Sequence, residues 1–464
     1  MSKNHSFFGN AFFYTLGVVL AQGTNYITMM ILGRLMTTDQ FGYLSVYVVW
    51  VNIFSMIAGL QAYGSMNNAK LDLGADKLDA YTSSTYGLGL VSMAAMVGIF
   101  FLLQDFLVSS MQFSFNLILL FLIQGFFSFT IQHLASKYRV LNQPGKFVFW
   151  TAAIWIIRLV VSILLVLQLA ENKYLGDVYG STIAYTVVGV AAVFVIFIRG
   201  KSFYNAKWWK YCLAISLPYV FSGLANYVLM QSNRLMLQYM STPEETGLYG
   251  YVATTAIAIT GVWIAFNNAW SVWYFDKTHA GEKEQIVHLY KKYCMFVTLL
   301  SVAFTLVCPD IVRILGGQQY SAGVNMVPLI AAGAYFLFLY SFPMAYEAYK
   351  QKTAYIAICT VAAAVLNIVI NLFVIPLYGG MGAAAATLVS YAALFIFHFI
   401  IARFVIKGFE IPFVQLLIPA LYVLASVVVT YLFMDAWPVR WILGFAMLGL
   451  SFRTYLQSRH IMME

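Results

Sequence analysis

The strongest constraint on this chain is a series of apolar runs, each about 20 residues long, that recur along its whole length with short polar breaks. A helix of that length and character crosses the hydrocarbon core of a bilayer. Only 9% of the 464 residues are charged, whereas about 25% are charged in a soluble domain. Because so apolar a chain could not cover its surface in water, we expect an all-α, polytopic membrane protein.

The runs predict about fourteen transmembrane helices. Their expected positions are 9–32, 43–66, 84–108, 113–133, 147–170, 178–198, 211–236, 248–274, 293–314, 325–346, 353–375, 381–402, 412–434 and 438–458. The first run is too long for a secretory signal, which favours a retained first span. No break is long and polar enough to form a separate soluble domain.

The basic residues sort by side of the membrane. With the N-terminus in the cytoplasm, 20 of the 26 Lys and Arg fall in inward segments, four fall in outward segments, and Arg158 and Arg234 fall within spans. Cytoplasmic loops carry an excess of Lys and Arg. We therefore expect a multi-pass protein of the cell inner (cytoplasmic) membrane with both termini in the cytoplasm. The same sorting explains the net charge of +9 without nucleic-acid binding.

The chain also repeats itself. The segment from Leu32 to Gly42 aligns with the segment from Leu237 to Gly247, an offset of 205 residues. Six predicted spans separate the two copies, and an even number keeps two halves in the same orientation. We expect an N-terminal six-helix lobe at 1–200, a C-terminal six-helix lobe at 201–405, and two additional transmembrane helices at 406–464.

Several motifs carry a family resemblance. They are Gly33-Arg34-Leu35 with Asp39-Gln40-Phe41-Gly42, Leu217-Pro218 through Asn233-Arg234-Leu235, Glu244 to Tyr249, Asn367 to Asn371, and Ile375 to Gly380 with Gly382 to Ala385. Over roughly residues 1–400 the chain resembles polysaccharide and O-antigen lipid flippases of the multidrug/oligosaccharidyl-lipid/polysaccharide (MOP) exporter superfamily. That family often has Asp-Arg where this chain has Asn233-Arg234.

The resemblance implies two six-helix lobes around a central cavity. It also implies transport of an undecaprenyl-diphosphate-linked oligosaccharide from the cytoplasmic to the outer leaflet by alternating access. The glycan would be a repeat unit of lipopolysaccharide O-antigen, capsule or exopolysaccharide. The expected partners are this lipid-linked oligosaccharide, membrane lipids, and either H⁺ or Na⁺ as coupling ion. We expect a monomer.

Arg158 is the first candidate for binding substrate. It lies near the middle of the predicted span 147–170, where a charged side chain costs at least ~2.5–3.5 kcal/mol. Thr151, Trp155 and Ser162 share its helical face, so this face would suit a hydrated cavity that receives a phosphate. The alternative is an Arg that bonds helix carbonyls or a neighbouring helix.

Arg234 is the second candidate, although it lies nearer the outer interface, where it could instead extend to the headgroups. Gln231 shares its stripe and Asn226 lies beside the stripe. Gln22 and Asn25 share a face of the first span and could bind sugar hydroxyls, and helix–helix hydrogen bonding is the alternative for such residues. The same alternative is favoured for Asn367 and Asn371.

The 17 acidic residues lie in loops or at span ends, and Glu347 lies at the cytoplasmic end of the predicted span 325–346. An ion pair with Lys350 would account for Glu347. A cation-coupled drug exporter usually needs a carboxylate inside the membrane. The absence of acids from the middle of the predicted spans therefore favours a transporter of an anionic substrate over a cation-coupled multidrug antiporter, which is the main alternative. A membrane polysaccharide polymerase or ligase ranks third. Because no nucleotide loop, metal-ligand cluster or nucleophile–base motif is present, we expect no cofactor, no metal and no enzyme.

Overall fold

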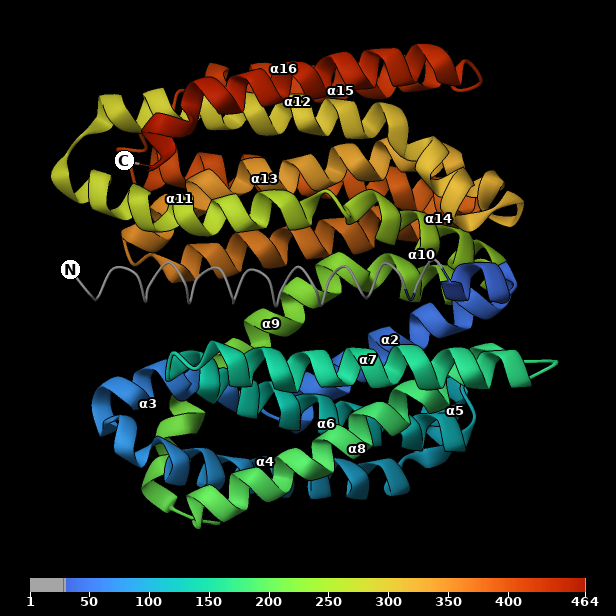
Figure 1. Ribbon diagram of the computed structural model, residues 1–464, viewed down its shortest axis with the longest axis vertical. Helices are drawn as coiled ribbons and strands as arrows, with labels where there is room; N and C mark the ends of the chain where they lie inside the picture. The colour runs from blue at the N-terminus through green and yellow to red at the C-terminus, as the bar shows by residue number, and fades with distance from the viewer. Residues whose placement is uncertain (1–27, 29–30, 464) are drawn as a thin grey trace. The chain divides into compact units, whose positions relative to one another are not determined.

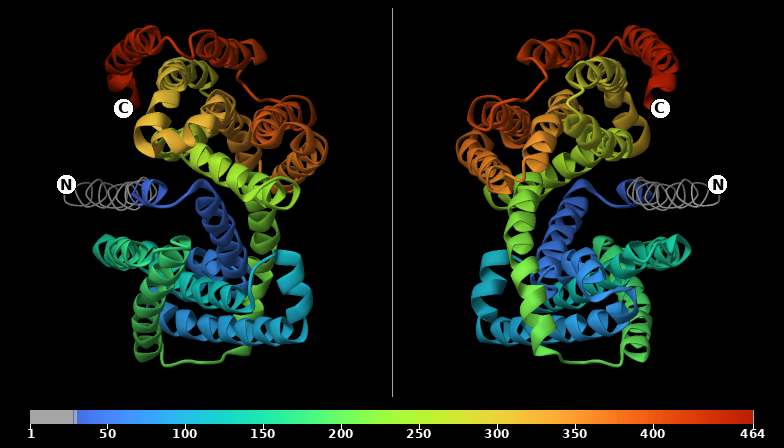
Figure 2. Two further views of the ribbon diagram at one scale, coloured as in Figure 1. Left: turned by 90° about the vertical axis from the view of Figure 1, so that its right-hand side faces the viewer. Right: turned by 90° about the vertical axis from the view of Figure 1, so that its left-hand side faces the viewer.

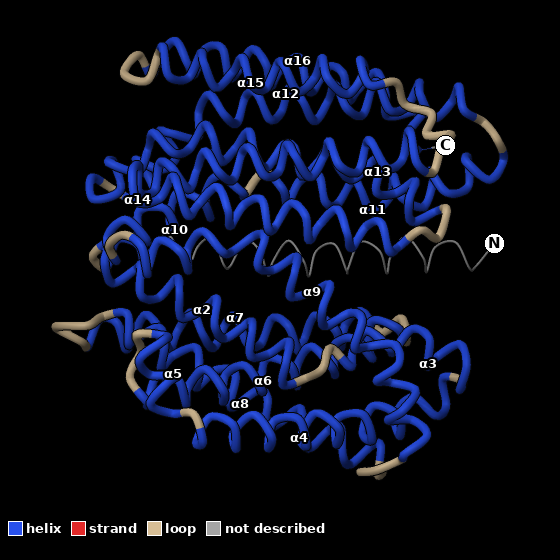
Figure 3. Tube along the Cα trace, turned by 180° about the vertical axis from the view of Figure 1, so that it is seen from behind, coloured by secondary structure: helices blue, strands red, loops and turns tan. Residues whose placement is uncertain are grey.

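The computed structural model describes Thr28 and residues 31–463. The described residues form helices joined by short loops, with no strand among them (Figure 3). Most of the predicted first span, 9–32, lies outside the described residues. Ten of the described helices are long and apolar enough to cross a membrane. The prediction of an all-α, polytopic membrane protein is confirmed.

The main helices follow one another along the chain as coloured in Figure 1. They are α2 (Thr38–Ala58), α3 (Met66–Leu73), α4 (Leu78–Leu102), α5 (Gln104–Met111), α6 (Phe115–Val140), α7 (Pro144–Gln168), α8 (Tyr174–Gly200), α9 (Ala206–Met240), α10 (Pro243–Ile257), α11 (Thr260–Ala280), α12 (Lys283–Gly316), α13 (Val327–Tyr349), α14 (Thr353–Ile400), α15 (Phe413–Leu432) and α16 (Trp437–Met463). Short helical turns are η1 (Ala62–Ser65), η2 (Ala75–Lys77), η3 (Gln318–Met326) and the π-helix η4 (Ile401–Val405).

The chain packs as two compact units. The N-terminal unit holds 43–227 with the described residues up to Met36, and the C-terminal unit holds 228–464 together with 37–42. The boundary between them falls inside α9. The division into lobes at 1–200, 201–405 and 406–464 stays a prediction.

Each predicted span after the first overlaps a helix of the structure. The predicted span 248–274 is divided between α10 and α11, which are separated by Ala258 and Ile259. The predicted spans 353–375 and 381–402 are the two halves of α14, which is broken at Gly379. Apolar run length predicts these helices well because the backbone of a lipid-exposed segment must satisfy its own hydrogen bonds.

The core of the N-terminal unit consists mainly of aromatic and aliphatic side chains from α4, α6, α7 and α8, with further buried residues from η1, α3 and α9. The Tyr86 and Phe129 rings stack there with centroids 5.9 Å apart, and the Tyr86 hydroxyl lies 3.0 Å from Thr130 Oγ1. This hydrogen bond satisfies the buried polar end of an otherwise apolar contact.

In the C-terminal unit α13 is the central helix, since most of its side chains are buried. It contacts α10, α11, α12, α14 and α15. The rings of Trp270, Tyr290, Tyr293 and Phe342 pack together beside it. In Figure 2 the hairpin of α15 and α16 lies at the outer side of this unit, where α16 packs along α12.

Arg440 joins this hairpin to α12. Its expected place is an outward loop, but it lies in the first turn of α16 and its side chain is fully buried. Nη2 donates to Asp310 Oδ1 at 2.7 Å and Nη1 donates to the Leu306 carbonyl at 2.7 Å. Nε donates to the Phe433 carbonyl at 3.0 Å. These bonds compensate the charge, so Arg440 is a structural anchor.

Candidate substrate-binding site

The two faces of α7 differ in character. Ile156, Val160 and Leu164 are exposed on one side, which is suited to contact with lipid. Ile154 and Ser162 are buried on the opposite side. Arg158 follows Ile154 and precedes Ser162 at steps of four, so it lies on the buried face, directed into the N-terminal unit. Its side chain is 15% exposed.

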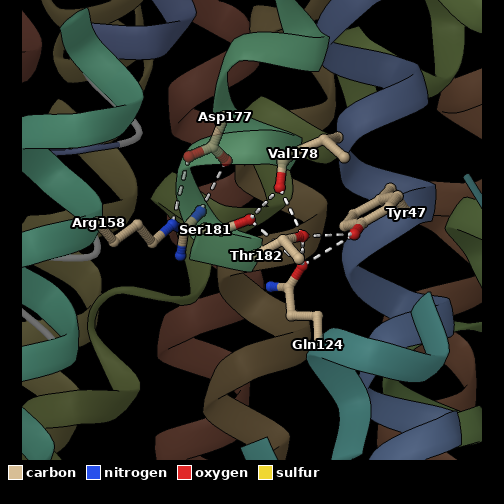
Figure 4. A network of polar contacts seen from close by, with 7 residues as sticks. All are labelled: Tyr47, Gln124, Arg158, Asp177, Val178, Ser181 and Thr182. Atoms are coloured by element: carbon tan, nitrogen blue, oxygen red, sulfur yellow. Dashed lines mark hydrogen bonds and ion pairs between the residues drawn. The ribbon is translucent and has the colours of Figure 1, made fainter. Parts of the chain in front are cut away.

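Arg158 pairs with Asp177 of α8 (Figure 4). Nε lies 3.3 Å from Asp177 Oδ1, and Nη2 lies 2.8 Å from Oδ2. Two parallel bonds of this kind fix the plane of the guanidinium as well as its position. The Trp155 ring lies on the same face of α7, with its centroid 5.9 Å from Arg158 Cζ. The structure therefore brings together the predicted residues Arg158 and Trp155.

Asp177 corrects one sequence expectation. The predicted sixth span begins at Val178, which left Asp177 at a span end, but α8 begins at Tyr174 and the Asp177 side chain is fully buried. A carboxylate therefore does lie inside the bundle. Because the guanidinium has five N–H donors and two of its nitrogens donate to Asp177, donors remain for a further anionic or polar group.

A neutral polar cluster adjoins this pair in Figure 4. The Tyr47 hydroxyl donates to Gln124 Oε1 at 2.9 Å, and the hydroxyls of Ser181 and Thr182 each donate to the same oxygen at 3.3 Å. These residues come from α2, α6 and α8. Gln124 therefore joins helices, which is the alternative that the sequence left open for isolated amides.

Arg234 lies on α9 in the C-terminal unit and contacts α10. Its Nη2 donates to Thr254 Oγ1 at 2.7 Å and approaches the Gly250 carbonyl at 3.4 Å. The side chain is half-buried. Helix carbonyl and hydroxyl groups on α10 therefore hold part of this guanidinium.

Next to Arg234, Asn233 belongs to a buried network of neutral side chains. Its Nδ2 donates to the Tyr249 hydroxyl at 2.7 Å and to Thr387 Oγ1 at 2.5 Å. Asn371 Nδ2 donates to Asn233 Oδ1 at 2.5 Å and to Asn367 Oδ1 at 3.0 Å. The network joins α9, α10 and both halves of α14, which confirms that Asn367 and Asn371 link helices.

The other predicted site residues are dispersed. Gln231 is half-buried on α9, and Asn226 is exposed on the same helix but in the other unit. Gln22 and Asn25 lie outside the described residues. Their roles in substrate binding stay predictions.

The expected ion pair between Glu347 and Lys350 is wrong. Glu347 Oε2 lies 2.9 Å from His398 Nδ1, and both side chains are fully buried. Lys350 Nζ lies instead over the rings of Tyr346 and Tyr349, 5.6 Å and 5.4 Å from their centroids. Nothing in the local sequence indicates the Glu347–His398 contact, because the two residues are on different helices.

This architecture, with apolar helices around buried ion pairs and polar clusters, is that of a multi-pass membrane protein. The chain belongs to the polysaccharide biosynthesis protein family, whose model matches residues 7–279, more than half of the sequence. Among curated proteins, no sequence matches the chain.

The chain shares its fold with solved transporters. One is a lipid II flippase, MurJ, in an inward closed conformation, with a TM-score of 0.72, 16% identity, and 97% of this chain and 99% of that chain covered. A second is an inward-facing multidrug resistance MATE family transporter of the MOP superfamily (TM-score 0.63, 15% identity, 84% and 94% covered). A third is a MOP superfamily transporter from Pyrococcus furiosus (TM-score 0.54, 12% identity, 90% and 96% covered).

Proposed function

We propose that this protein is a flippase that moves an undecaprenyl-diphosphate-linked oligosaccharide from the cytoplasmic to the outer leaflet of the inner membrane by alternating access. The observation that carries the proposal is the Arg158 guanidinium, which is directed into the N-terminal unit and has donors beyond those that bond Asp177. Membership of the polysaccharide biosynthesis family supports a glycan-linked substrate. The glycan would be an O-antigen, capsule or exopolysaccharide repeat unit.

The physical problem is to carry a diphosphate and sugars across about 30 Å of hydrocarbon, where they would lose their hydration. In this proposal, the free N–H groups of Arg158 bind a phosphate oxygen while Asp177 keeps the guanidinium oriented. Trp155 offers a ring face for a sugar. The polyprenyl tail stays in the bilayer outside the protein. Two negative charges that move outward from a negative interior gain about 4.6 kcal/mol per 100 mV.

The proposal is tested by complementation of a deletion strain. We expect deletion of the gene to trap lipid-linked repeat units on the cytoplasmic side, and the wild-type gene to restore surface glycan. Arg158→Ala should abolish export. Because that change also leaves Asp177 buried without its partner, the paired variant Arg158→Gln with Asp177→Asn is needed, since it keeps polar side chains at both positions and leaves no unpaired charge.

The matched control is Lys277→Gln with Glu282→Gln, which removes a partly exposed ion pair of the same protein. We expect that control to export glycan normally. Full export by the Arg158→Gln/Asp177→Asn variant, with wild-type protein levels, would remove Arg158 from substrate binding.

One observation favours a second function. The fully buried Asp177 is the kind of carboxylate that a cation-coupled multidrug antiporter uses, and its apparent absence had counted against that alternative. If the antiporter function holds, expression should protect cells from cationic dyes, Asp177→Asn should abolish that protection, and surface glycan should not change in the deletion strain.

A further inference from the structure

Besides the Arg440–Asp310 pair, the C-terminal unit holds another buried ionisable pair, Glu347 and His398. Glu347 is close to the end of α13 and His398 is close to the end of α14. Both side chains are 0% exposed, and Glu347 Oε2 lies 2.9 Å from His398 Nδ1. By the predicted topology this is the cytoplasmic end of both helices, because the basic segment with Lys350 follows α13.

Each member of the pair has a polar atom that is left without a partner. Within the described part of the chain, neither Glu347 Oε1 nor His398 Nε2 has a hydrogen-bond partner, although both atoms are buried. Such groups are rare in folded proteins and usually have a specific reason. In a purely structural ion pair, we would expect both of these atoms to have a hydrogen-bond partner.

Two groups that interact with the pair, a phenol and a thiol, do not offer it a compensating charge. The Tyr340 ring of α13 lies 5.3 Å from the His398 ring, centroid to centroid. Cys359 of α14 is within electrostatic range of Glu347 and is buried. A neutral phenol and a neutral thiol leave the charge of the pair unbalanced.

Two cations of the neighbouring elements, Arg403 and Lys350, and the acid Glu410 have other contacts. Arg403 of η4 donates to the Phe409 carbonyl at 2.7 Å, and Lys350 lies over two tyrosine rings. Tyr274 of α11 donates to Glu410 at 3.0 Å. Lys407, in the segment after η4, contributes its carbonyl oxygen, which accepts from the Tyr346 hydroxyl.

The proton content of the pair therefore decides its net charge. With one proton between Oε2 and Nδ1 and none on Nε2, the pair is a carboxylate beside a neutral imidazole and carries a net charge of −1. With one more proton it is neutral, either as carboxylate and imidazolium or as carboxylic acid and imidazole. A net charge is costly in a dry interior, so loss of the second proton favours entry of water and separation of α13 from α14.

We propose that Glu347 and His398 form a proton-binding site, whose deprotonation opens the contact between the cytoplasmic ends of α13 and α14. If the protein transports its substrate as proposed above, this site makes H⁺, rather than Na⁺, the coupling ion. Binding of one H⁺ neutralises the pair and closes the contact, and its release reverses both changes. No other ligand is required.

The site is tested without any substrate, by infrared difference spectroscopy of the purified full-length protein in lipid vesicles at acidic and alkaline pH. Glu347→Gln is a close isostere, and exposed Glu284→Gln on α12 is the matched control. We expect the wild-type protein and the control to share bands of the pair that change with pH, and Glu347→Gln to lack them. Persistence of the same bands in Glu347→Gln, or their absence from the wild-type protein, overturns the proposal.

Opening is measured by hydrogen–deuterium exchange. Exchange is corrected for its intrinsic pH dependence. In the wild-type protein, alkaline pH should then increase exchange at the ends of α13 and α14 by at least tenfold. In Glu347→Gln, alkaline pH should have little further effect. If Glu347→Gln does not fold, His398→Gln is expected to lose the same pH response. Equal responses in the wild-type protein and in whichever variant folds contradict the coupling.

The complementation assay separates the two proposals. If the wild-type gene restores no surface glycan, the flippase proposal fails, whereas the infrared and exchange results still decide the proton site. If Glu347→Gln folds, loses the bands of the pair and still exports glycan at the wild-type rate, the pair binds a proton but H⁺ coupling through it is wrong.

Discussion

At the scale of single residues, several buried charges in the described part of the chain pair with a charge on a neighbouring helix. Arg158 meets Asp177, Arg440 meets Asp310, and Lys137 Nζ lies 2.6 Å from Asp79 Oδ1. An isolated charge inside a bilayer costs several kcal/mol, so a partner on a neighbouring helix decides whether the helix can be accommodated. Asp79 and Asp177 each lie in the first turn of their helix, where a carboxylate also interacts favourably with the helix dipole.

The Arg158–Asp177 pair predicts a strongly non-additive effect on stability. Arg158→Ala or Asp177→Ala alone leaves one buried charge without its partner and should lower the free energy of unfolding by about 3–5 kcal/mol. The double alanine variant leaves neither charge and should cost clearly less than the sum. Unfolding of the purified protein in detergent by increasing SDS measures all three. Additive losses would mean that the two charges do not depend on each other.

The sequence predicted only part of these pairs, for a physical reason. Arg158 was identifiable because it interrupts an apolar run. Asp177 was not identifiable, because it precedes the predicted span 178–198 by one residue. The sequence also does not indicate which way the first turn of a helix faces. The contact between Glu347 and His398 spans 51 residues, so only the tertiary packing of α13 on α14 creates it.

At the scale of the elements, α14 shows how one residue divides a long apolar segment. Gly379 has φ 52° and ψ −132°, a conformation that is open mainly to glycine. The chain folds back there, as shown by the hydrogen bond that Asn367 in the first half donates to Ser390 in the second half at 3.2 Å. Glu245 Oε2 accepts the Gly380 N–H at 2.8 Å at the start of the second half. The two predicted spans were correct because Pro376 and the glycines interrupt the apolar run.

Gly379→Ala should therefore destabilise the protein by about 1–3 kcal/mol through backbone strain. The new Cβ would also overlap the Glu245 carboxylate. Gly98→Ala in α4 is the control, since nothing lies within 4 Å of the added Cβ, and helix propensity predicts a small stabilisation. Thermal unfolding of the two purified variants beside the wild-type protein provides the comparison. Equal melting temperatures for Gly379→Ala and the wild-type protein would contradict the strain.

At the scale of the whole molecule, the predicted orientation can be tested directly. The four native cysteines, Cys212, Cys294, Cys308 and Cys359, are buried, so an introduced exposed cysteine can be labelled selectively. Glu171→Cys lies between α7 and α8, and Lys207→Cys lies in the first turn of α9; both sites are exposed.

If both termini are cytoplasmic, an impermeant maleimide should label Glu171→Cys in intact spheroplasts and should label Lys207→Cys only after permeabilisation. The native protein without an added cysteine is the control for background labelling. The reverse pattern would invert the topology and would place the Glu347–His398 pair at the outer surface.

The internal repeat also has a structural counterpart. Residues 37–42 pack with the C-terminal unit, and there the starts of α2 and α10 meet. A Cβ on Gly42 would overlap the Pro243 carbonyl oxygen, and a Cβ on Gly247 would overlap the Thr38 carbonyl oxygen. Thr38 matches Pro243, and Gly42 matches Gly247, at the same offset of 205 that aligns Leu32 with Leu237. The two turns thus contact each other reciprocally, as copies related by a two-fold axis would.

This reciprocity predicts that Gly42→Ala and Gly247→Ala are equivalent. Each adds a methyl group against a backbone oxygen that cannot move independently, so each should lower the free energy of unfolding by about 1–3 kcal/mol. Gly449→Ala in α16 is the control, because nothing lies within 4 Å of its added Cβ. SDS titration of the three purified variants measures the losses. A large loss for one glycine with none for the other would show that the two turns do not make equivalent contacts, and would remove this support for the repeat.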